Sequence, residues 1–242
     1  MPDKRSHRGP HPEDARLFAE AQWPILRDAV ADLSLLLGKG YAEKSALKLV
    51  GDRFGLTERQ RIAVMRCSCS DNALAGRLGR EVMPDLVCGR ELVIDGYNVL
   101  TTVEAALAGG VVIRGRDGCY RDMASMHGTF RKVRETAPAL CLIGEAVASL
   151  KPQHSHWLLD SPVSNSGRLR SQMRDLAAER KWPWEIELVT NPDAVLAVSA
   201  GIVATADSVV LDRCRSWINL ARFVLTSGLP NAGIIDLAPE PC

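Results

Sequence analysis

From about residue 90 onward, short apolar runs alternate with stretches of helical periodicity. The runs have the length of buried strands and are Leu92–Ile94, His156–Leu159, Ile186–Val189, Ile202–Ala204 and Phe223–Leu225. The helical stretches between them cover about Tyr120–Glu135, Arg168–Lys181 and Ser208–Leu220. Strands that are apolar along their whole length and are separated by helices are typical of a parallel sheet covered on both faces. The pattern therefore predicts an α/β fold with a doubly wound parallel sheet over residues 89–242.

Before residue 89 the apolar residues recur at helical spacing, which predicts a small all-helical domain over residues 1–88. The expected helices are Ala15–Gln22, Pro24–Leu37, Ala42–Phe54 and Glu58–Cys67. Thr57 followed by Gln60 has the capping-box pattern at the start of the last helix. Met83–Arg90, with its proline and glycine, is the expected linker.

Composition excludes several classes of protein. With 46% hydrophobic and 24% charged residues, the chain has the balance of a folded protein. A formal charge of +1 excludes nucleic-acid binding through a polybasic tail, although it leaves local basic surfaces open. No apolar run approaches the roughly 18–20 residues of a membrane span. The polar N-terminus also lacks a secretory signal. We therefore expect a cytoplasmic protein with no membrane partner and with reduced thiols.

Four of the predicted strands are followed, at once or within a few residues, by an aspartate. These residues are Asp95, Asp160, Asp193 and Asp207. Because parallel strands end at the same edge of a sheet, we expect the four carboxylates to gather there. Like charges repel, and a hard cation such as Mg²⁺ would neutralise them and promote phosphodiester cleavage. For each residue alone the alternative is a helix N-cap or a turn, most easily for Asp193.

Three motifs carry a resemblance to a known family. They are Asp95-Gly96-Tyr97-Asn98, Leu158-Leu159-Asp160 and Thr205-Ala206-Asp207, in this order. In this order they resemble the PIN-like superfamily of nucleases, most closely its NYN branch. The whole chain also resembles an uncharacterised prokaryotic family that joins a helical N-terminal domain to a PIN-like domain. That second resemblance is carried by Gly40-Tyr41, Leu47-Lys48-Leu49-Val50-Gly51-Asp52-Arg53 and Arg59-Gln60-Arg61.

The resemblance implies a PIN-like fold and a hydrolase, a Mg²⁺- or Mn²⁺-dependent nuclease that acts on RNA. It implies Asp95, Asp160 and Asp207 as metal ligands and catalytic residues. Asn98 would orient Asp95 or a bound water, and Asp193 would fill the remaining acidic position. The related pattern often shows an acidic doublet there, whereas this chain has Asn191-Pro192-Asp193.

The long connection from Thr101 to Ser155 contains further candidates. Arg114, Arg116 and Arg121 are predicted to clamp phosphate, because guanidinium groups bind phosphate oxygens in pairs. Asp117 or Asp122 would complete the metal shell. The alternative is a charged turn with internal ion pairs. His127, on the following predicted helix, is expected to be a packed or surface residue rather than a catalyst.

A polar segment after Asp160 predicts a second phosphate-binding element. Ser161 and Ser164 precede the helix over 168–181, where free backbone N–H groups favour anions. Arg168, Arg170 and Arg174 would then form a phosphate track along that helix, and a solvated helix face is the alternative.

The chain has no G-x-S-x-G, Walker A or G-x-G-x-x-G motif, which leaves serine hydrolases and nucleotide binding without support. Cys67, Cys69 and Cys88 lack the usual zinc spacing and an evident fourth ligand. The main alternative function is a non-catalytic nucleic-acid-binding or regulatory protein. Residues 45–65 loosely fit a helix-turn-helix, with Arg59, Arg61 and Arg66 facing phosphate. The substrate and the formation of a homo-oligomer stay open.

Overall fold

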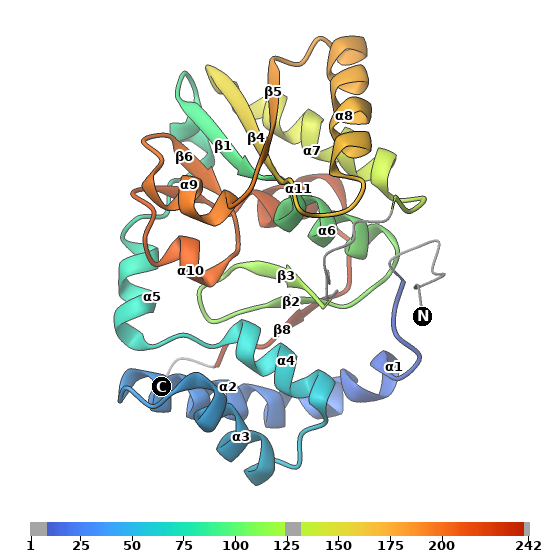
Figure 1. Cartoon of the computed structure of the whole chain (residues 1–242). Coiled ribbons are helices and arrows are strands. Elements are labelled where there is room, and N and C mark those ends of the chain that lie inside the picture. Colours follow the sequence, from blue (N-terminus) through green and yellow to red (C-terminus); the bar gives the residue numbers. More distant parts are fainter. Residues whose placement is uncertain (1–8, 124–131, 240–242) are drawn as a thin grey trace.

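Five parallel strands form the central sheet of the computed structural model, which describes residues 9–123 and 132–239 (Figure 1). Their order in the sheet is β5-β4-β1-β6-β7, and each neighbouring pair is parallel. The strands are β1 (Glu91–Asp95), β4 (His154–Asp160), β5 (Trp184–Val189), β6 (Ile202–Ala204) and β7 (Trp217–Ile218). The predicted α/β class with a parallel sheet is confirmed.

The chain leaves the centre of this sheet in two opposite directions. After β1 it moves to β4 and then to β5 at one edge, and after β5 it returns to β6 on the other side of β1. The crevice between the carboxyl ends of β1 and β6 is therefore the topological switch point, where open α/β sheets usually bind ligands.

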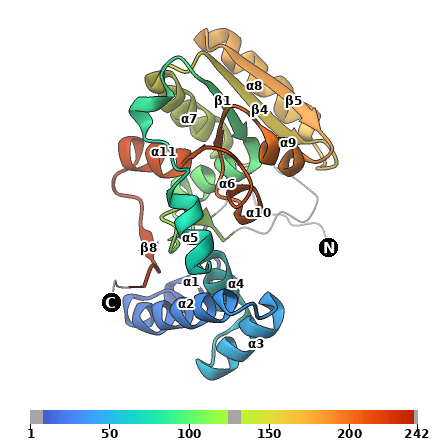
Figure 2. The same ribbon diagram turned by 90° about the vertical axis from the view of Figure 1, so that its left-hand side faces the viewer.

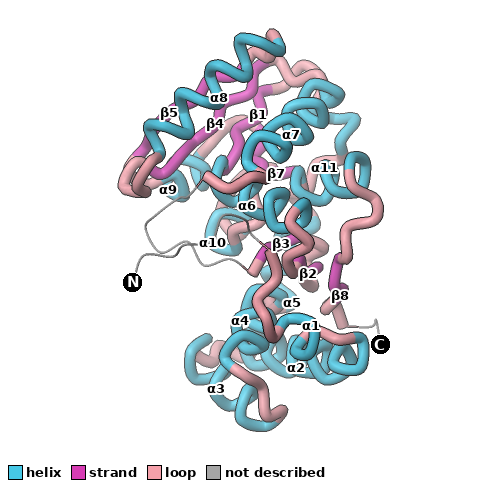
Figure 3. Tube along the Cα trace, turned by 90° about the vertical axis from the view of Figure 1, so that its right-hand side faces the viewer, coloured by secondary structure: helices cyan, strands magenta, loops and turns pink. Residues whose placement is uncertain are grey.

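Helices cover both faces of the sheet because side chains alternate along each strand. On one face, Ile94 and Trp157 belong to a core with α6 (Gly96–Leu107), α7 (Thr136–Leu150), α8 (Ser166–Arg180) and α11 (Leu220–Gly228). On the other face, Val93 and Leu158 pack with α9 (Pro192–Val198) and α10 (Ser208–Leu211). Figure 3 shows α7, α8 and α11 in front of the strands and α9 behind them.

The N-terminal region is helical, as predicted. Its elements are α1 (Asp14–Leu17), η1 (Glu20–Gln22), α2 (Trp23–Gly38), α3 (Glu43–Arg53), α4 (Glu58–Cys67), α5 (Asp71–Leu78) and η2 (Pro84–Val87). The predicted capping box of Thr57 and Gln60 is present at the start of α4. Figure 2 shows α5 rising from the other helices toward α10.

A second, three-stranded sheet lies between these helices and the central sheet (Figure 1). It has the order β3-β2-β8 and consists of β2 (Val112–Arg114), β3 (Tyr120–Asp122) and β8 (Ile234–Asp236). Ile113 and Ile235 of this sheet share one buried core with Leu33 of α2. The helical region is thus packed on residues from the middle and the end of the chain.

Three of the elements predicted beyond residue 90 differ from the structure, and the expected helix Ala15–Gln22 is divided into α1 and η1. The expected helix over 120–135 begins instead with the strand β3, and residues 124–131, including His127, lie outside the described residues. The expected strand Phe223–Leu225 belongs to α11, because a short apolar run fits a strand and a buried helix equally well. The expected helix Ser208–Leu220 ends at Leu211 and is followed by β7. In the described part of the chain, no helix is both long and apolar enough to cross a membrane.

Candidate active site at the carboxyl edge of the sheet

Asp95 is the last residue of β1 and lies at the switch point. Its side chain is 9% exposed and caps α6, because Oδ1 accepts a hydrogen bond from the Asn98 backbone N–H at 3.4 Å. The Thr205 hydroxyl donates to the other oxygen, Oδ2, at 2.7 Å. One carboxylate therefore joins the end of β1 to the residue that follows β6.

Asn98 and Thr205 extend this connection. The Asn98 side-chain oxygen accepts a hydrogen bond from the Ala206 backbone N–H at 2.8 Å. The Thr205 hydroxyl oxygen accepts one from the Asp207 N–H at 3.0 Å. Asp207 in turn caps α10, because its Oδ1 accepts from the N–H groups of Val209 and Val210 at 2.8 and 3.0 Å. The structure thus brings Asp95, Asn98 and Asp207 together, as the motifs predict.

A pocket of about 300 Å³ opens beside Asp95. It is lined by Asp95, Tyr97, Leu158, Asp160, Pro162, Val163, Thr190, Asn191, Pro192 and Asp193. Asp160, at the end of β4, has a buried Oδ1 atom without a hydrogen-bond partner. Asp193 is exposed in the first turn of α9. Three of the four predicted aspartates therefore line one pocket, whereas Asp207 lies outside that lining.

Burial raises the pKa values of three aspartates at this edge, and neighbouring carboxylates add to the rise for two of them. Burial raises the pKa of Asp95 to about 7, against the opposing hydrogen bond from Thr205, and the charges of Asp207 and Asp193 add to the rise. Burial also raises the pKa of Asp193, with contributions from Asp207 and Asp160. For Asp160, burial alone raises the pKa. A proton or a cation at this edge is thereby favoured.

The oxygen donors of this edge suit a hard divalent cation in kind. Among residues 9–123 and 132–239, however, no group of three or more His, Cys, Asp or Glu side chains is arranged to hold a metal ion. Mg²⁺ is usually bound by one or two carboxylates together with waters and substrate phosphates, so it does not require such a closed group. The unpartnered oxygen of Asp160 fits this open kind of binding.

The predicted phosphate clamps of the long connection have partners within the protein. Arg114 pairs with Asp236 of β8. Arg116 pairs with Asp71 and donates to the Cys69 carbonyl oxygen. Arg121 is 6% exposed and pairs with Asp117. The structure therefore shows the internal ion pairs of the alternative, and these arginines do not line the pocket.

The two candidates for completing the metal shell also point elsewhere. Asp117 is 3% exposed and is held by Arg77 and Arg121. Asp122 is buried and accepts hydrogen bonds from the hydroxyl groups of Thr101 and Thr102. Asp117, in the β2–β3 turn, contacts Arg77 of α5, because a buried charge requires a partner.

Only the first part of the predicted phosphate-binding element after β4 lies next to the pocket. Ser161 and Ser164 are exposed and flank the lining residues Pro162 and Val163. The arginines of α8 lie farther along the chain. Arg168 is exposed, Arg170 is half-buried, and Arg174 donates to the Ile186 carbonyl oxygen of β5 at 3.3 Å. None of the three is part of the described pocket lining.

Two family models match separate parts of the chain, one within the helical region and one over the central sheet. A model described as a domain of unknown function, DUF5616, matches residues 84–223. The chain belongs to the DUF5616 family. A second model, DUF434, described as a protein of unknown function, matches residues 25–80. The Uncharacterized protein MJ0935 of Methanocaldococcus jannaschii is 28% identical over 188 residues, which cover 77% of this chain and 88% of that protein. No solved structure matches the chain.

The DUF5616 match contains the whole pocket lining, including residues that the sequence did not single out. Tyr97 lies inside the Asp-Gly-Tyr-Asn motif, and Thr205 lies two residues before Asp207. Thr190 and Asn191 follow β5 at the place where aspartates follow the other strands. A search for any polar residue after each strand, rather than for carboxylates alone, would have found them.

The arginines of the predicted helix-turn-helix lie in the DUF434 match and contact their own chain. Arg59 donates to both carboxylate oxygens of Asp14. Arg61 donates to the Leu56 carbonyl oxygen at 3.0 Å, and Arg66 donates to the Asp122 carbonyl oxygen.

Proposed function

We propose that this chain is a metal-dependent nuclease that hydrolyses phosphodiester bonds in RNA. The observation that carries the proposal is the Asp95–Thr205 contact across the switch point, beside a pocket lined by two further aspartates. The raised pKa of Asp95 supports it, because such shifts are common where carboxylates are arranged for catalysis. The resemblance of the Asp95–Asn98 motif to the NYN branch of the PIN-like nucleases supports the same chemistry.

In this proposal each residue has a defined task. Asp95, Asp160 and Asp193 would hold a Mg²⁺ or Mn²⁺ ion, which would stabilise the negative charge that develops on the phosphate during cleavage. Asn98 fixes the β6–α10 connection through the Ala206 N–H. Asp207 adds negative charge near Asp95, which strengthens the preference for a cation. Ser161 and Ser164, exposed beside the pocket, offer hydroxyl donors to the phosphates of the substrate.

The alternative of a non-catalytic nucleic-acid-binding protein has less support. Its proposed phosphate contacts were Arg59, Arg61 and Arg66, and each of these guanidinium groups is bound within the protein. Ion pairs and carbonyl contacts would have to break before these arginines could bind phosphate.

Cleavage assays with a single substitution test the proposed nuclease. Purified protein is incubated with labelled single-stranded RNA, structured RNA and DNA, with Mg²⁺ or Mn²⁺ and with chelator. We expect cleavage of RNA that chelator abolishes and that Asp95→Asn reduces at least roughly 100-fold, because a ligand of the cation is lost.

Asp85→Asn is the matched control, since Asp85 is exposed in η2 and lies outside the pocket lining. It should cleave like the wild type. Binding without cleavage under every metal condition, unaffected by Asp95→Asn, would contradict the nuclease and favour the binding protein.

A further inference from the structure

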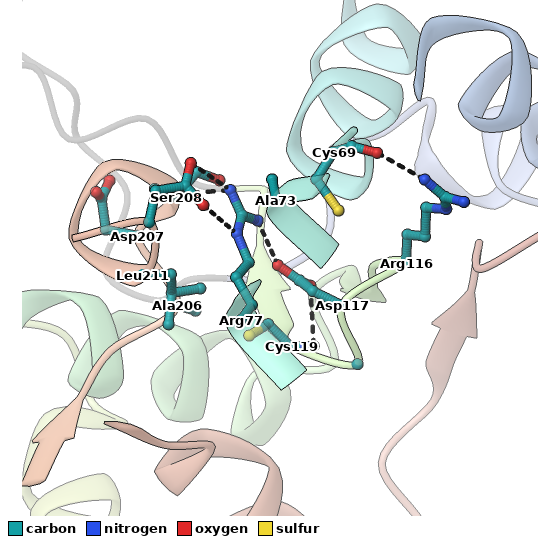
Figure 4. A network of polar contacts seen from close by, with 12 residues as sticks. Cys69, Ala73, Arg77, Arg116, Asp117, Cys119, Ala206, Asp207, Ser208 and Leu211 are labelled. Atoms are coloured by element: carbon teal, nitrogen blue, oxygen red, sulfur yellow. Dashed lines mark hydrogen bonds and ion pairs between the residues drawn. The ribbon is translucent and has the colours of Figure 1, made fainter. Parts of the chain in front are cut away.

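A buried network of ion pairs contacts the β6–α10 connection at the carbonyl oxygens of Ala206 and Ser208 (Figure 4). Its first member, Arg121 of β3, is 6% exposed. The Arg121 Nη1 and Nη2 atoms donate to the two carboxylate oxygens of Asp117 at 2.8 and 2.7 Å. The third donor, Nε, contacts the Ala206 carbonyl oxygen at 2.8 Å. Ala206 is therefore held through its N–H by Asn98 and through its carbonyl by Arg121.

The second member is Arg77 of α5, which is 3% exposed. Its Nη1 donates to the same Asp117 carboxylate at 2.7 Å. Its Nε and Nη2 donate to the two oxygens of Asp212 at 2.7 and 3.0 Å. Nη2 also contacts the Ser208 carbonyl oxygen at 3.4 Å. Arg77 thus binds the residues at both ends of α10, the helix that Asp207 caps.

Asp117 stays charged in this network. Burial acts to raise its pKa, but the guanidinium groups of Arg121 and Arg77 hold that pKa well below its usual range. The turn also leaves no room beside the network, because a Cβ atom at Gly115 would lie 2.8 Å from Arg121 Nη1 and 3.2 Å from Asp117 Oδ1. The close packing and the charged carboxylate of Asp117 fix the directions in which Arg77 and Arg121 donate hydrogen bonds.

Stability alone does not account for such a network. Buried ion pairs can often be replaced by well-packed apolar residues without loss of stability, because burying the charges costs free energy. Apolar side chains could not, however, donate directed hydrogen bonds to the carbonyl oxygens of Ala206 and Ser208. These bonds act on the segment 205–212, which contains Thr205 and Asp207.

We infer that Arg77 and Arg121 are positioning residues of the acidic site, which hold Thr205 against Asp95, and Asp207 at the start of α10, through Asp117, Ala206 and α10. This inference rests on the proposed nuclease function for its catalytic meaning. It makes α5, which lies in the helical N-terminal region, a structural part of a site formed by the DUF5616 region.

Matched aspartate substitutions test the positioning without removing a buried charge. Asp212→Asn weakens the contact with Arg77, and the Asp212 side chain is 43% exposed, so the protein should still fold. Asp71→Asn is the control, because it weakens an ion pair between α5 and Arg116 that does not reach residues 205–212. Arg77→Lys is a second test variant, since one ammonium group cannot span Asp117, Ser208 and Asp212.

The readout is amide hydrogen exchange at Ala206 and Asp207, relative to Ile94 in β1. Both amides are hydrogen-bonded in the connection, to Asn98 and Thr205. We expect exchange roughly tenfold faster or more in Asp212→Asn and Arg77→Lys, and wild-type exchange in Asp71→Asn, because loosening is local. Unchanged rates in both test variants, or equal acceleration at Ile94, overturn the inference.

RNA cleavage supplies the second readout. With the substrate contacts intact, kcat should fall about tenfold in Arg77→Lys while KM stays within about twofold. Faster exchange with an unchanged kcat would overturn the positioning role. If the wild type cleaves no nucleic acid, the proposed function fails, and the exchange rates alone then decide whether the network positions the segment.

Discussion

At the scale of single residues, Asp95 combines burial, hydrogen bonding and neighbouring charge. Its two oxygens accept from Asn98 and Thr205, yet its pKa still rises to about 7. Burial therefore outweighs two favourable hydrogen bonds. Near neutral pH this carboxyl group is poised between a protonated form and a charged form that binds a cation.

The raised pKa of Asp95 makes the free energy of unfolding depend on pH in a defined direction. Because the pKa is about 7 in the folded protein and ordinarily 3.8, the folded state holds a proton that the unfolded chain has lost between these values. Asp95 thus stabilises the fold fully below about pH 4, and its contribution is lost as pH rises through about 7, by up to roughly 4 kcal/mol.

Urea unfolding at pH 5 and pH 8 measures this dependence. We expect Asp95→Asn to gain stability relative to the wild type at pH 8, since it removes a buried charge. At pH 5 only part of the contribution of Asp95 is lost, so the difference between the two proteins should be smaller than at pH 8. Equal differences at both values would show that Asp95 does not titrate in this window.

At the residue scale, the sequence signal is clearest where it is local. Asp95 and Asn98 are three residues apart, at the junction of a strand and a helix, so a short motif is sufficient to pair them. Arg121 was predicted to bind phosphate because guanidinium groups bind phosphate oxygens in pairs. Its partners are Asp117 and Ala206, and only tertiary burial reveals that the guanidinium group is committed to them.

At the scale of elements, the approach of α6 to β4 sets where Asp95 lies. Gly96 begins α6, directly after Asp95. A Cβ atom at this position would lie 2.5 Å from Leu159 Cδ2 and 2.9 Å from the Leu158 carbonyl oxygen. The latter is backbone of β4 and cannot move aside without shifting the strand. Glycine therefore allows the helix to start against its neighbouring strand.

Gly96→Ala should separate these two elements. We expect a loss of about 1–3 kcal/mol in the free energy of unfolding, because overpacking forces the backbone to move. Cleavage should fall as well, since Asp95 moves with α6. Gly167→Ala is the control, because a Cβ at Gly167 in the first turn of α8 meets no atom within 4 Å. Denaturant unfolding that leaves Gly96→Ala as stable as Gly167→Ala would contradict this account.

The predicted elements succeeded or failed according to their length and pairing. The central strands β1, β4, β5 and β6 were recognised by their short apolar runs, although β5, at the edge of the sheet, is only partly buried. β2, β3 and β8 have three residues each, and β8 pairs with a strand more than a hundred residues earlier in the chain. Strands this short show no hydrophobic periodicity in the sequence, so the sheet that they form was not predicted.

At the scale of the whole molecule, the helical region and the α/β region are joined at several places besides the Arg77 network. Leu33 of α2 shares a buried core with Ile113, Ile235 and Leu237, which come from the middle and the end of the chain. On the other side, the segment after α5 pairs with β7, because the Val82 N–H donates to the Trp217 carbonyl oxygen at 2.7 Å. The two regions therefore share a buried core and backbone hydrogen bonds where they meet.

This construction predicts one cooperative unfolding transition. Trp23→Phe removes the tryptophan of the helical region, and the remaining four tryptophans all lie beyond residue 150. In this variant, fluorescence reports unfolding of the α/β region alone. Far-ultraviolet circular dichroism reports unfolding of all helices. Adding Leu33→Ala should cost about 2–5 kcal/mol and should move both midpoints equally, because its core includes residues of the small sheet. If the dichroism midpoint moved and the fluorescence midpoint stayed, the helical region would unfold separately, and its arginine at position 77 could not hold the acidic site in the way inferred above.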